Sequence, residues 1–132
     1  MKRFGLSEKE RLKKKKSFDL VYSNGKTIYS HSRKLKAVFH IQSSHEESGV
    51  KAAFAVYRKA GKAVWRNRVK RLLRESFRLN KKIITDSLVN SGKIVFIVFS
   101  PAAFKQKTHA KLKLIDIEPG VTDILKQISK LC

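Results

Sequence analysis

The segment of residues 62–78 reads KAVWRNRVKRLLRESFR and carries two interleaved patterns. The side chains at the 3, 4, 7, 8 spacing of one helix side are apolar or small: Val69, Leu72, Leu73, Ser76 and Phe77. The opposite arc is basic and holds Arg66, Lys70, Arg71, Arg74 and Arg78. This spacing predicts a helix over about residues 66–80, with a continuation to Ile84 as the alternative, and with one side in the core and arginines on the other.

The chain on either side of this helix predicts a small sheet. Residues 94–99 are apolar on both faces, which favours a fully covered central strand. Residues 35–41 alternate between apolar and other residues, as a half-buried strand does. Residues 51–57 form a second strand, which we expect to close a hairpin with the first across the polar loop at 43–49. A short strand at 27–29 precedes them.

Two further amphipathic segments predict helices at the two ends of the chain. Phe18, Val21 and Tyr22 predict a helix over 17–23, which Asn24-Gly25 ends with the glycine in the left-handed conformation. Pro119-Gly120 precede a terminal helix whose apolar stripe is Val121, Ile124, Leu125, Ile128 and Leu131. The predicted fold class is α+β, a four-stranded sheet packed with three helices in the order αβββαβα.

Length and composition narrow the class of protein. The 132 residues fit one domain, 1–132, and the hydrophobic share of 42% argues against global disorder. The chain has neither an apolar run of the ~20 residues that a spanning helix needs nor an apolar segment after Lys2 and Arg3 that would make a secretory signal. Cys132 is the one cysteine and has no internal disulfide partner. We therefore expect a soluble, reduced protein of the cytoplasm.

The charge is large and unevenly distributed. Lys plus Arg number 31 against 10 acidic residues, which gives a formal net charge of +21. Residues 1–16 hold eight basic and two acidic residues, and we expect them to form a flexible basic N-terminal segment. Residues 51–82 hold twelve basic residues against Glu75 alone. Such a surface indicates a polyanionic partner, nucleic acid first and an anionic membrane surface as the weaker alternative.

The sequence contains none of the residue patterns that are typical of catalytic or metal-binding sites. The four histidines have no metal-ligand spacing with cysteine or acidic residues, and no paired carboxylates, glycine-rich phosphate loop or nucleophile elbow can be found. The sequence therefore predicts no catalytic and no metal-binding residue, and it favours a binding subunit. An amphipathic membrane-surface helix is disfavoured because the apolar stripe of the 66–80 helix is needed for the core.

The sequence resembles a known family, the protein component of bacterial ribonuclease P. The segment Gly61 to Arg78 is similar to the signature of that family, with Arg66-Asn67-Arg68 as its core. Leu12-Lys13-Lys14, with Phe18, Tyr22 and Gly25, resembles the first helix and turn of the family. The resemblance covers about residues 11–104.

The resemblance implies a function and a partner. The family's subunit binds a large catalytic RNA, and the two together remove the 5′ leader from precursor tRNA. The active centre lies in the RNA, so Mg²⁺ is expected to be held mainly by the RNA subunit and the substrate. The resemblance implies no protein partner and no membrane. It also implies a left-handed βαβ crossover, which breaks the usual rule of handedness.

Two sets of site residues follow from the resemblance. Positions that match RNA-subunit contacts are Arg66, Asn67, Arg68, Lys70, Arg71 and Arg74. Positions that match the leader cleft, or lie beside it, are Phe18, Tyr22, Lys51, Tyr57 and Arg58. The family usually has Ser-Lys-Lys or Ser-Lys-Arg where this chain has Tyr57-Arg58-Lys59, so the added ring either offers another stacking surface or reshapes the cleft.

Two questions stay open at the level of sequence. Phe18 and Tyr22 lie one helical turn apart and either stack on single-stranded RNA or pack in the core, for which Val21 is the better candidate. A ribosomal-type structural protein that binds rRNA is the alternative function, and the composition alone does not separate it from the first. The segment 105–119 is longer than is typical of the family that the sequence resembles, and no role can be assigned to it from the sequence.

Overall fold

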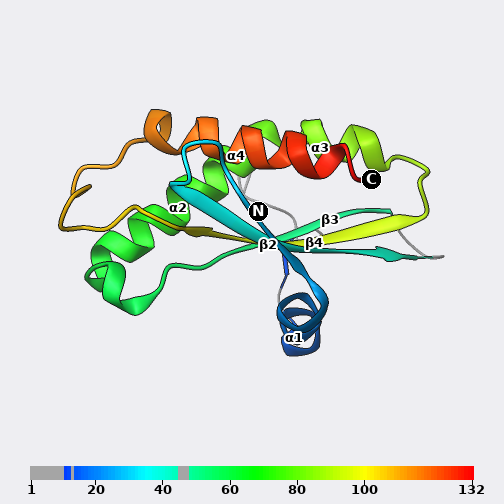
Figure 1. Cartoon of the computed structure of the whole chain (residues 1–132), viewed down its shortest axis with the longest axis horizontal. Helices are drawn as coiled ribbons and strands as arrows, with labels where there is room; N and C mark the ends of the chain where they lie inside the picture. Colours follow the sequence, from blue (N-terminus) through cyan, green and yellow to red (C-terminus); the bar gives the residue numbers. More distant parts are fainter. Residues whose placement is uncertain (1–10, 13, 45–47) are drawn as a thin grey trace, which may run out of the picture.

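The computed structural model describes residues 11–12, 14–44 and 48–132, which form an α+β fold (Figure 1). The elements are α1 (Lys15–Asn24), β1 (Lys26–Tyr29), β2 (Leu35–Ser43), β3 (Gly49–Phe54), the 3-10 helix η2 (Arg58–Ala60), α2 (Ala63–Asn80), α3 (Lys82–Leu88), β4 (Lys93–Pro101) and α4 (Leu114–Ser129). Of the N-terminal segment expected to be flexible, residues 1–10 and 13 lie outside the described part. No helix in the described part is both long and apolar enough to cross a membrane.

The sheet has the strand order β1-β2-β4-β3. The predicted hairpin between 35–41 and 51–57 is wrong, because β4 lies between these strands, antiparallel to β2 and parallel to β3. The reason is the composition of β4, where every residue from Ile94 to Phe99 is buried. A strand that is apolar on both faces is most stable with a neighbour on each side and a layer of structure over each face.

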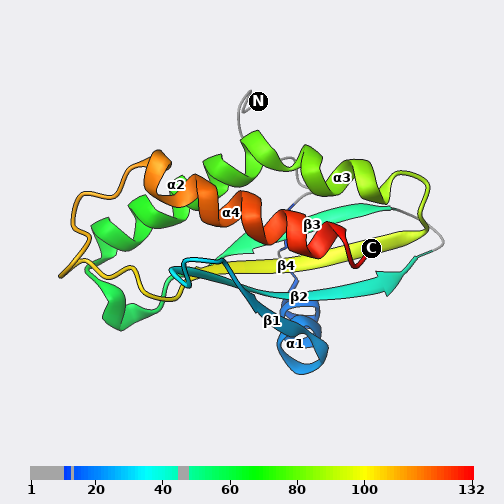
Figure 2. The same ribbon diagram turned by 45° about the horizontal axis from the view of Figure 1, so that its top comes forward.

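The connection from β3 to β4 is left-handed. Figure 2 shows it from the helix side, where the chain leaves β3, passes through α2 and α3 in front of the sheet, and returns to β4 on the side toward β2. With parallel strands that run toward the left of this view, the path from β3 to β4 turns with the opposite hand from the usual crossover. The crossover expected from the family resemblance is confirmed.

The two faces of the sheet are covered unequally. Helices α2, α3 and α4 lie on one face and α1 lies on the other (Figure 1). The face under α2, α3 and α4 holds the larger core, where the rings of Phe54, Phe77 and Phe99 pack with centroids 5.8 to 6.0 Å apart. The buried residues on the α1 face form a smaller cluster: Leu12, Val21, Ile94, Phe96 and Val98. The side chains of β4 alternate between the two.

Helix α2 ends at Asn80, as the predicted span 66–80 has it, and the alternative continuation to Ile84 is wrong because the separate helix α3 follows. The described residues therefore form four α-helices rather than three. Asn80 donates its side-chain amide to the Ser76 carbonyl at 2.8 Å and to a Glu118 carboxylate oxygen at 3.1 Å. A side chain that bonds to the backbone in this way competes with the regular helix pattern. The Lys81 carbonyl then accepts the N–H groups of Ile84 and Thr85 and starts α3.

Helix α4 begins at Leu114, before Pro119-Gly120 and not after them as expected. The Lys113 N–H donates to Asp116 Oδ2 at 2.8 Å, which caps the helix start. Pro119 is exposed in the second turn, where it removes one backbone hydrogen bond. Gly120 lies where a Cβ would come 2.6 Å from Leu35 Cδ1, so its small size lets α4 approach β2 closely.

Helix α1 begins two residues earlier and ends one residue later than predicted, and Gly25 ends it for a different reason. Gly25 has φ −79° and ψ 163°, which is extended and not left-handed. A Cβ at this position would lie 2.2 Å from the carbonyl oxygen of Val21. Glycine is therefore needed for the close approach of the chain to the last turn of α1.

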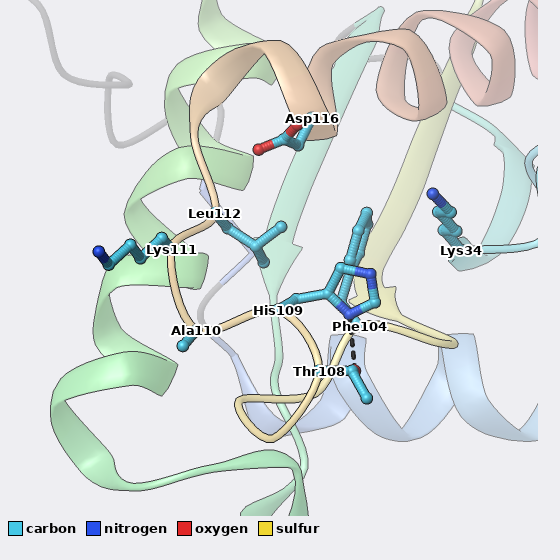
Figure 3. Close-up of a pocket in the computed structure, with 8 residues that line it drawn as sticks. All are labelled: Lys34, Phe104, Thr108, His109, Ala110, Lys111, Leu112 and Asp116. Atoms are coloured by element: carbon cyan, nitrogen blue, oxygen red, sulfur yellow. Dashed lines mark hydrogen bonds between the residues drawn. The ribbon is translucent and has the colours of Figure 1, made fainter.

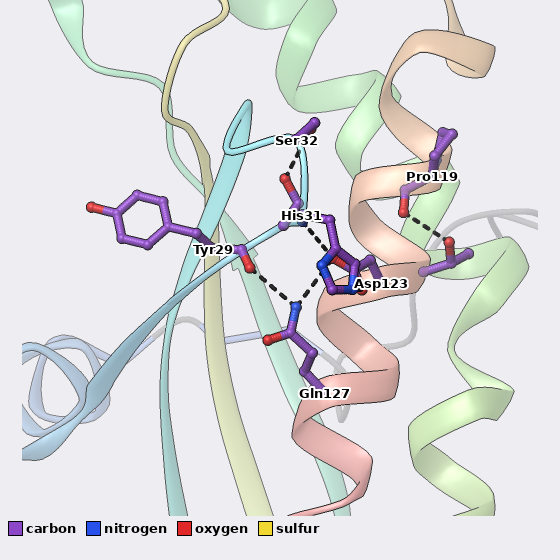
Figure 4. A network of polar contacts seen from close by, with 8 residues as sticks. Tyr29, His31, Ser32, Pro119, Asp123 and Gln127 are labelled. Carbon is purple, nitrogen blue, oxygen red and sulfur yellow. Dashed lines mark hydrogen bonds and ion pairs between the residues drawn. The ribbon is translucent and has the colours of Figure 1, made fainter.

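A polar network fixes the turn between β1 and β2 to α4 (Figure 4). The His31 N–H donates to Asp123 Oδ2 at 2.7 Å, and the His31 ring nitrogen Nε2 lies 3.0 Å from Asp123 Oδ1. The Gln127 amide donates to the Tyr29 carbonyl at 3.1 Å. These contacts hold the turn before β2, which includes Lys34, in a defined position beside α4.

Candidate nucleic-acid interface

The burial of α2 fixes the direction in which its basic residues point. Its buried residues are Trp65, Val69, Leu73, Ser76 and Phe77, which confirms the predicted apolar stripe apart from Leu72, which is half-buried. Asn67, Arg71 and Arg74 are exposed on the other side. We call the six residues Arg66, Asn67, Arg68, Lys70, Arg71 and Arg74 the arginine surface.

Two arginines of this surface are oriented by backbone carbonyls. Arg66 donates its Nε–H to the Gly61 carbonyl at 3.1 Å. Arg68 donates its Nε–H and one Nη2 hydrogen to the Leu112 carbonyl, at 3.1 and 2.8 Å. A guanidinium has five N–H donors, so Arg68 keeps three and Arg66 keeps four for a ligand. Guanidinium groups held in this way lose less conformational freedom when they grip a phosphate.

The segment 105–119, which had no role at the level of sequence, begins in a loop that docks along the first two turns of α2. Trp65 donates its indole N–H to the His109 carbonyl at 3.0 Å, one helical turn before Arg68 reaches Leu112. The loop thus runs beside α2 in the same direction. No spacing in the sequence marks these contacts, because both acceptors are main-chain carbonyls of an irregular segment.

The start of α2 is partly occupied by this loop. The Gln106 side-chain oxygen accepts the N–H of Lys62, the residue before α2, at 2.8 Å. The Gln106 N–H in turn donates to the Ala60 carbonyl at 2.8 Å. One of the backbone N–H groups that a helix start leaves without a partner in the helix is therefore already bonded to Gln106. The basic side chains of α2, and not its terminus, are the main anion-binding feature.

Charge at the C-terminal half of α2 is partly compensated. Arg78 pairs with Glu75 one turn earlier, with Nε 3.1 Å from Glu75 Oε2. The hydrogen bond from Arg78 lowers the pKa of Glu75 below its ordinary value, and burial opposes this effect. The Arg74 guanidinium carbon lies 6.0 Å from the centre of the Phe54 ring. The uncompensated positive charge of α2 is thus concentrated from Arg66 to Arg74.

The α1 face brings together two of the predicted leader-binding residues. Phe18 is half-buried and packs against the small cluster of Leu12, Val21 and the β4 side chains. Lys51 of β3 is half-buried on the same face, directly across from Phe96 of β4. Tyr22 lies on the outer side of α1 and is 57% exposed. Val21 is fully buried, as expected for the core residue of this helix.

Sequence reasoning missed Phe96 as an aromatic residue of this face. In the sheet register Phe96 lies between His40 of β2 and Lys51 of β3. The run 94–99 gave no sign of this position, because a strand buried on both faces has no alternation that separates its two sides. Only the pairing of β4 with β2 and β3 shows that Phe96 lies on the α1 face.

The other two predicted leader residues lie beyond the end of β3. Tyr57 is 45% exposed and Arg58 is exposed, where the chain leaves β3 for η2. The structure therefore groups Phe18 with Lys51, and it sets Tyr57 with Arg58 at the end of β3 that leads to α2.

Among the described residues, no group of three or more histidines, cysteines and acidic residues is placed to hold a metal ion. Cys132 is half-buried at the end of the chain, and burial raises the pKa of its thiol, which lowers its reactivity at neutral pH.

Comparison with known proteins assigns the family. The family model described as Ribonuclease P matches residues 6–116. The chain is 40% identical over 83 residues to a ribonuclease P protein component of Maridesulfovibrio salexigens, an alignment that covers 63% of this chain and 64% of the relative. It is 31% identical over 122 residues to that of Clostridium novyi, covering 92% and 96%. For the first two curated relatives that it matches, the chain spans 64% and 61% of their length.

A solved structure agrees with these matches. The ribonuclease P protein from Thermotoga maritima superposes with a TM-score of 0.69 at 26% identity, over 89% of this chain and 96% of that one. The family match covers the arginine surface and the whole α1 face, which are the two places where the chain gathers cationic and aromatic side chains. The chain therefore belongs to the ribonuclease P protein family.

Proposed function

We propose that this chain is the RNA-binding protein subunit of ribonuclease P, which assists a catalytic RNA in the endonucleolytic removal of the 5′ leader from precursor tRNA. The observation that carries the proposal is the Arg66-Asn67-Arg68 segment at the start of α2, within the matched region, with both guanidinium groups oriented by backbone carbonyls. The arginine surface contacts the catalytic RNA. The α1 face contacts the leader.

The arginine surface suits a folded RNA. Guanidinium groups bind phosphates with two parallel hydrogen bonds, and Asn67 offers both a donor and an acceptor to a sugar or base edge. The helix that carries them is anchored by five buried residues, so the groups hold their spacing when RNA binds. A rigid support of this kind favours recognition of one RNA shape over diffuse attraction.

The α1 face suits a single strand. Exposed or half-exposed rings within a basic groove are the usual means of binding unpaired bases, which stack on them. Phe18 and Tyr22 supply rings one turn apart on α1, and Lys51 supplies a cation on the adjacent strand. Tyr57 and Arg58 extend this surface along the path of a longer leader.

Mg²⁺ is the cofactor of the proposed reaction and is held mainly by the RNA subunit and the substrate. Carboxylates are the protein groups that Mg²⁺ prefers, and the described residues offer no cluster of them. What this chain supplies is binding: it neutralises phosphates and orients the leader. Catalytic groups are expected in the RNA.

The test begins with the RNA that accompanies the chain. The chain is expressed with an affinity tag in a bacterial host, purified at low salt, and the bound RNA is sequenced. We expect one structured catalytic RNA. A ribosomal-type role, the alternative function, predicts rRNA instead.

The second part of the test is reconstitution. Purified, RNA-free chain and the RNA subunit are mixed with precursor tRNA at a low Mg²⁺ concentration. We expect leader removal at one site only when both are present, and none with the chain alone. Site-specific cleavage by the chain alone would contradict the proposal.

A further inference from the structure

A pocket lies beside the arginine surface, between the loop that docks on α2 and the starts of β2 and α4. Its volume is about 310 Å³. The lining residues are Lys34, Phe104, Thr108, His109, Ala110, Lys111, Leu112 and Asp116 (Figure 3). This volume is within the range of small-ligand pockets, which begins at about 300 Å³. None of the lining residues belongs to the sites described above.

Both walls of the pocket are held by main-chain hydrogen bonds. The Lys34 carbonyl accepts the N–H groups of Ala102 and Ala103, at 2.8 and 3.1 Å. On the other side, the carbonyls of His109 and Leu112 accept hydrogen bonds from Trp65 and Arg68. The pocket is therefore preformed, and a ligand that enters it does not have to order the loop.

The floor of the pocket is apolar and its polar groups stand around the rim. Phe104 and Leu112 are buried beneath it. The His109 ring packs edge-on against the Phe104 ring, with centroids 4.8 Å apart, and its Nδ1 lies 2.8 Å from the Thr108 hydroxyl. The imidazole is thus held in one orientation and keeps Nε2 for a ligand.

Two opposite charges face the pocket from different elements. Figure 3 shows Asp116 above and Lys34 to the right of the His109 and Phe104 rings, and the Lys111 side chain pointing toward α2. Asp116 Oδ2 accepts the Lys113 N–H, which leaves Oδ1 as an acceptor. A ligand with an anionic group, a flat apolar ring and an amino group has a partner for each part.

We infer that this pocket binds one unstacked nucleotide of the RNA partner, with its phosphate at Lys34, its base against His109 and an exocyclic amino group of the base at Asp116. Carboxylates accept hydrogen bonds from base amino groups, so the site favours adenine, cytosine or guanine over uracil. Unpaired bases that stack on an aromatic side chain are the main targets of sequence-specific RNA recognition.

The position of the pocket assigns the nucleotide to the RNA subunit. Arg68, a member of the arginine surface, holds the same loop carbonyl that forms the pocket wall, so the two sites are contiguous. The predicted leader face lies on the other side of the sheet, with α1 (Figure 1). The inference rests on the proposed function, because it takes the arginine surface to bind that RNA.

The first experiment compares Lys34→Ala with Lys126→Ala, a matched loss of one exposed lysine on the last turn of α4. Affinity for the RNA subunit is titrated over a range of salt concentrations. We expect Lys34→Ala to weaken binding at least about fivefold more than Lys126→Ala and to reduce the salt slope by about 0.7, the value for one phosphate of a single strand. Equal effects of the two variants would overturn the inference.

The second experiment locates the nucleotide. A photoreactive amino acid replaces Ala110, an exposed lining residue, and a control chain carries it at Lys130. After irradiation of the assembled complex, reverse-transcription stops map the crosslinks. We expect one dominant position from residue 110 and none there from residue 130. Crosslinks spread evenly along the RNA would contradict a nucleotide site.

The third experiment tests the amino group. The mapped nucleotide is replaced by an analogue without its exocyclic amine, and the chain carries Asp116→Asn, which keeps an oxygen for the Lys113 N–H. Each change alone is expected to weaken binding about tenfold, and the two together no more than either one. Additive losses would remove Asp116 from the contact.

The failure of this inference can be told apart from failure of the proposed function. If the chain assembles with the catalytic RNA and Lys34→Ala behaves as Lys126→Ala does, the pocket inference is wrong and the function stands. If the chain does not bind that RNA at all, the function is wrong. If free adenosine monophosphate displaces the crosslink at the concentration of the RNA, the pocket serves a small molecule and the inference is again wrong.

Discussion

The two faces of the sheet differ in how completely they are covered. On the helix face, α2, α3 and α4 bury a continuous core that includes a cluster of three phenylalanine rings. On the other face α1 packs on a cluster of five buried residues that includes its own Val21, and Phe18 and Lys51 are half-buried. Stability is thus concentrated on one face, and the other keeps rings and cations at the surface, where a ligand can reach them.

Strand β4 joins these two environments within a single element. Phe99 points into the helix-face core and is 0% exposed, whereas Phe96 points toward α1 and is 8% exposed. The same residue type on one strand therefore samples both faces. Truncating each ring separately measures how unequal the two faces are.

The largest effect is expected from Phe99→Ala. Removing a fully buried ring from a dense core lowers the free energy of unfolding by about 3–5 kcal/mol, a large part of the stability of a small domain. Phe96→Ala is expected to cost about 1–2 kcal/mol less, because one helix covers its cavity and can settle into it. Chemical denaturation followed by circular dichroism gives both values. Equal losses would mean that α1 is packed as tightly as the other helices.

The second-largest effect is expected from Phe18→Ala on the α1 face, and it concerns RNA binding more than stability. Stacking of one base on an aromatic ring is worth about 1–3 kcal/mol, so Phe18→Ala should weaken precursor tRNA binding about five- to a hundredfold. Mature tRNA has no leader and should bind as before. The measurement is a pair of titrations on the assembled holoenzyme.

A matched control separates stacking from helix docking. Leu20 is half-buried on α1 and packs against the same cluster as Phe18, but it has no ring. Leu20→Ala should therefore leave the ratio of precursor to mature tRNA binding unchanged. If both variants lower this ratio equally, the leader depends on the placement of α1 and not on the Phe18 ring, and Tyr57 becomes the next candidate.

The contrast between the faces also explains what the sequence could and could not predict. The stripe of α2 and the apolar run of β4 could be predicted because burial imposes each of them within one segment, as a helical spacing in α2 and as an unbroken apolar run in β4. The insertion of β4 between β2 and β3 was missed because strand order depends on contacts between distant segments. Residues 51–57 look the same whether the neighbouring strand is β2 or β4.

The site divides in the same way. Arg66, Asn67 and Arg68 were identified by a motif, and the structure adds that backbone carbonyls orient the two guanidinium groups. The loop that provides one of these carbonyls has no periodicity, so neither its docking on α2 nor its pocket was predictable. Every residue has a backbone carbonyl, so the sequence does not show which carbonyls accept these hydrogen bonds.

The arginine surface belongs to neither face of the sheet, and a change there should alter binding without altering stability. Arg71 is exposed in the middle of it. Arg71→Ala should lower the affinity for the RNA subunit and reduce the slope of log affinity against log salt by about 0.7–0.9 for the phosphate it neutralises. The free energy of unfolding should stay within about 0.5 kcal/mol of the parent chain. Salt titrations with Lys130→Ala as the control check this, and equal losses would mean that charge acts diffusely.

The smallest effect is expected from the ion pair at the exposed side of α2, even though this helix covers the more stable face. The hydrogen bond from Arg78 holds the pKa of Glu75 below its ordinary value of 4.5, so the folded state favours the ionised carboxylate. The stabilisation is present above pH 4.5 and is lost as the pH falls through the lowered pKa of the folded state. Glu75→Gln should therefore lower the melting temperature slightly at pH 7 and not at all in strong acid, where the parent chain is also uncharged at this position. A salt bridge at the protein surface contributes little to stability, so the melting temperatures of the two chains should differ only slightly at every pH.

A loss of stability as large as that of Phe96→Ala would mean that the outer side of α2 contributes to folding and not only to the presentation of its arginines.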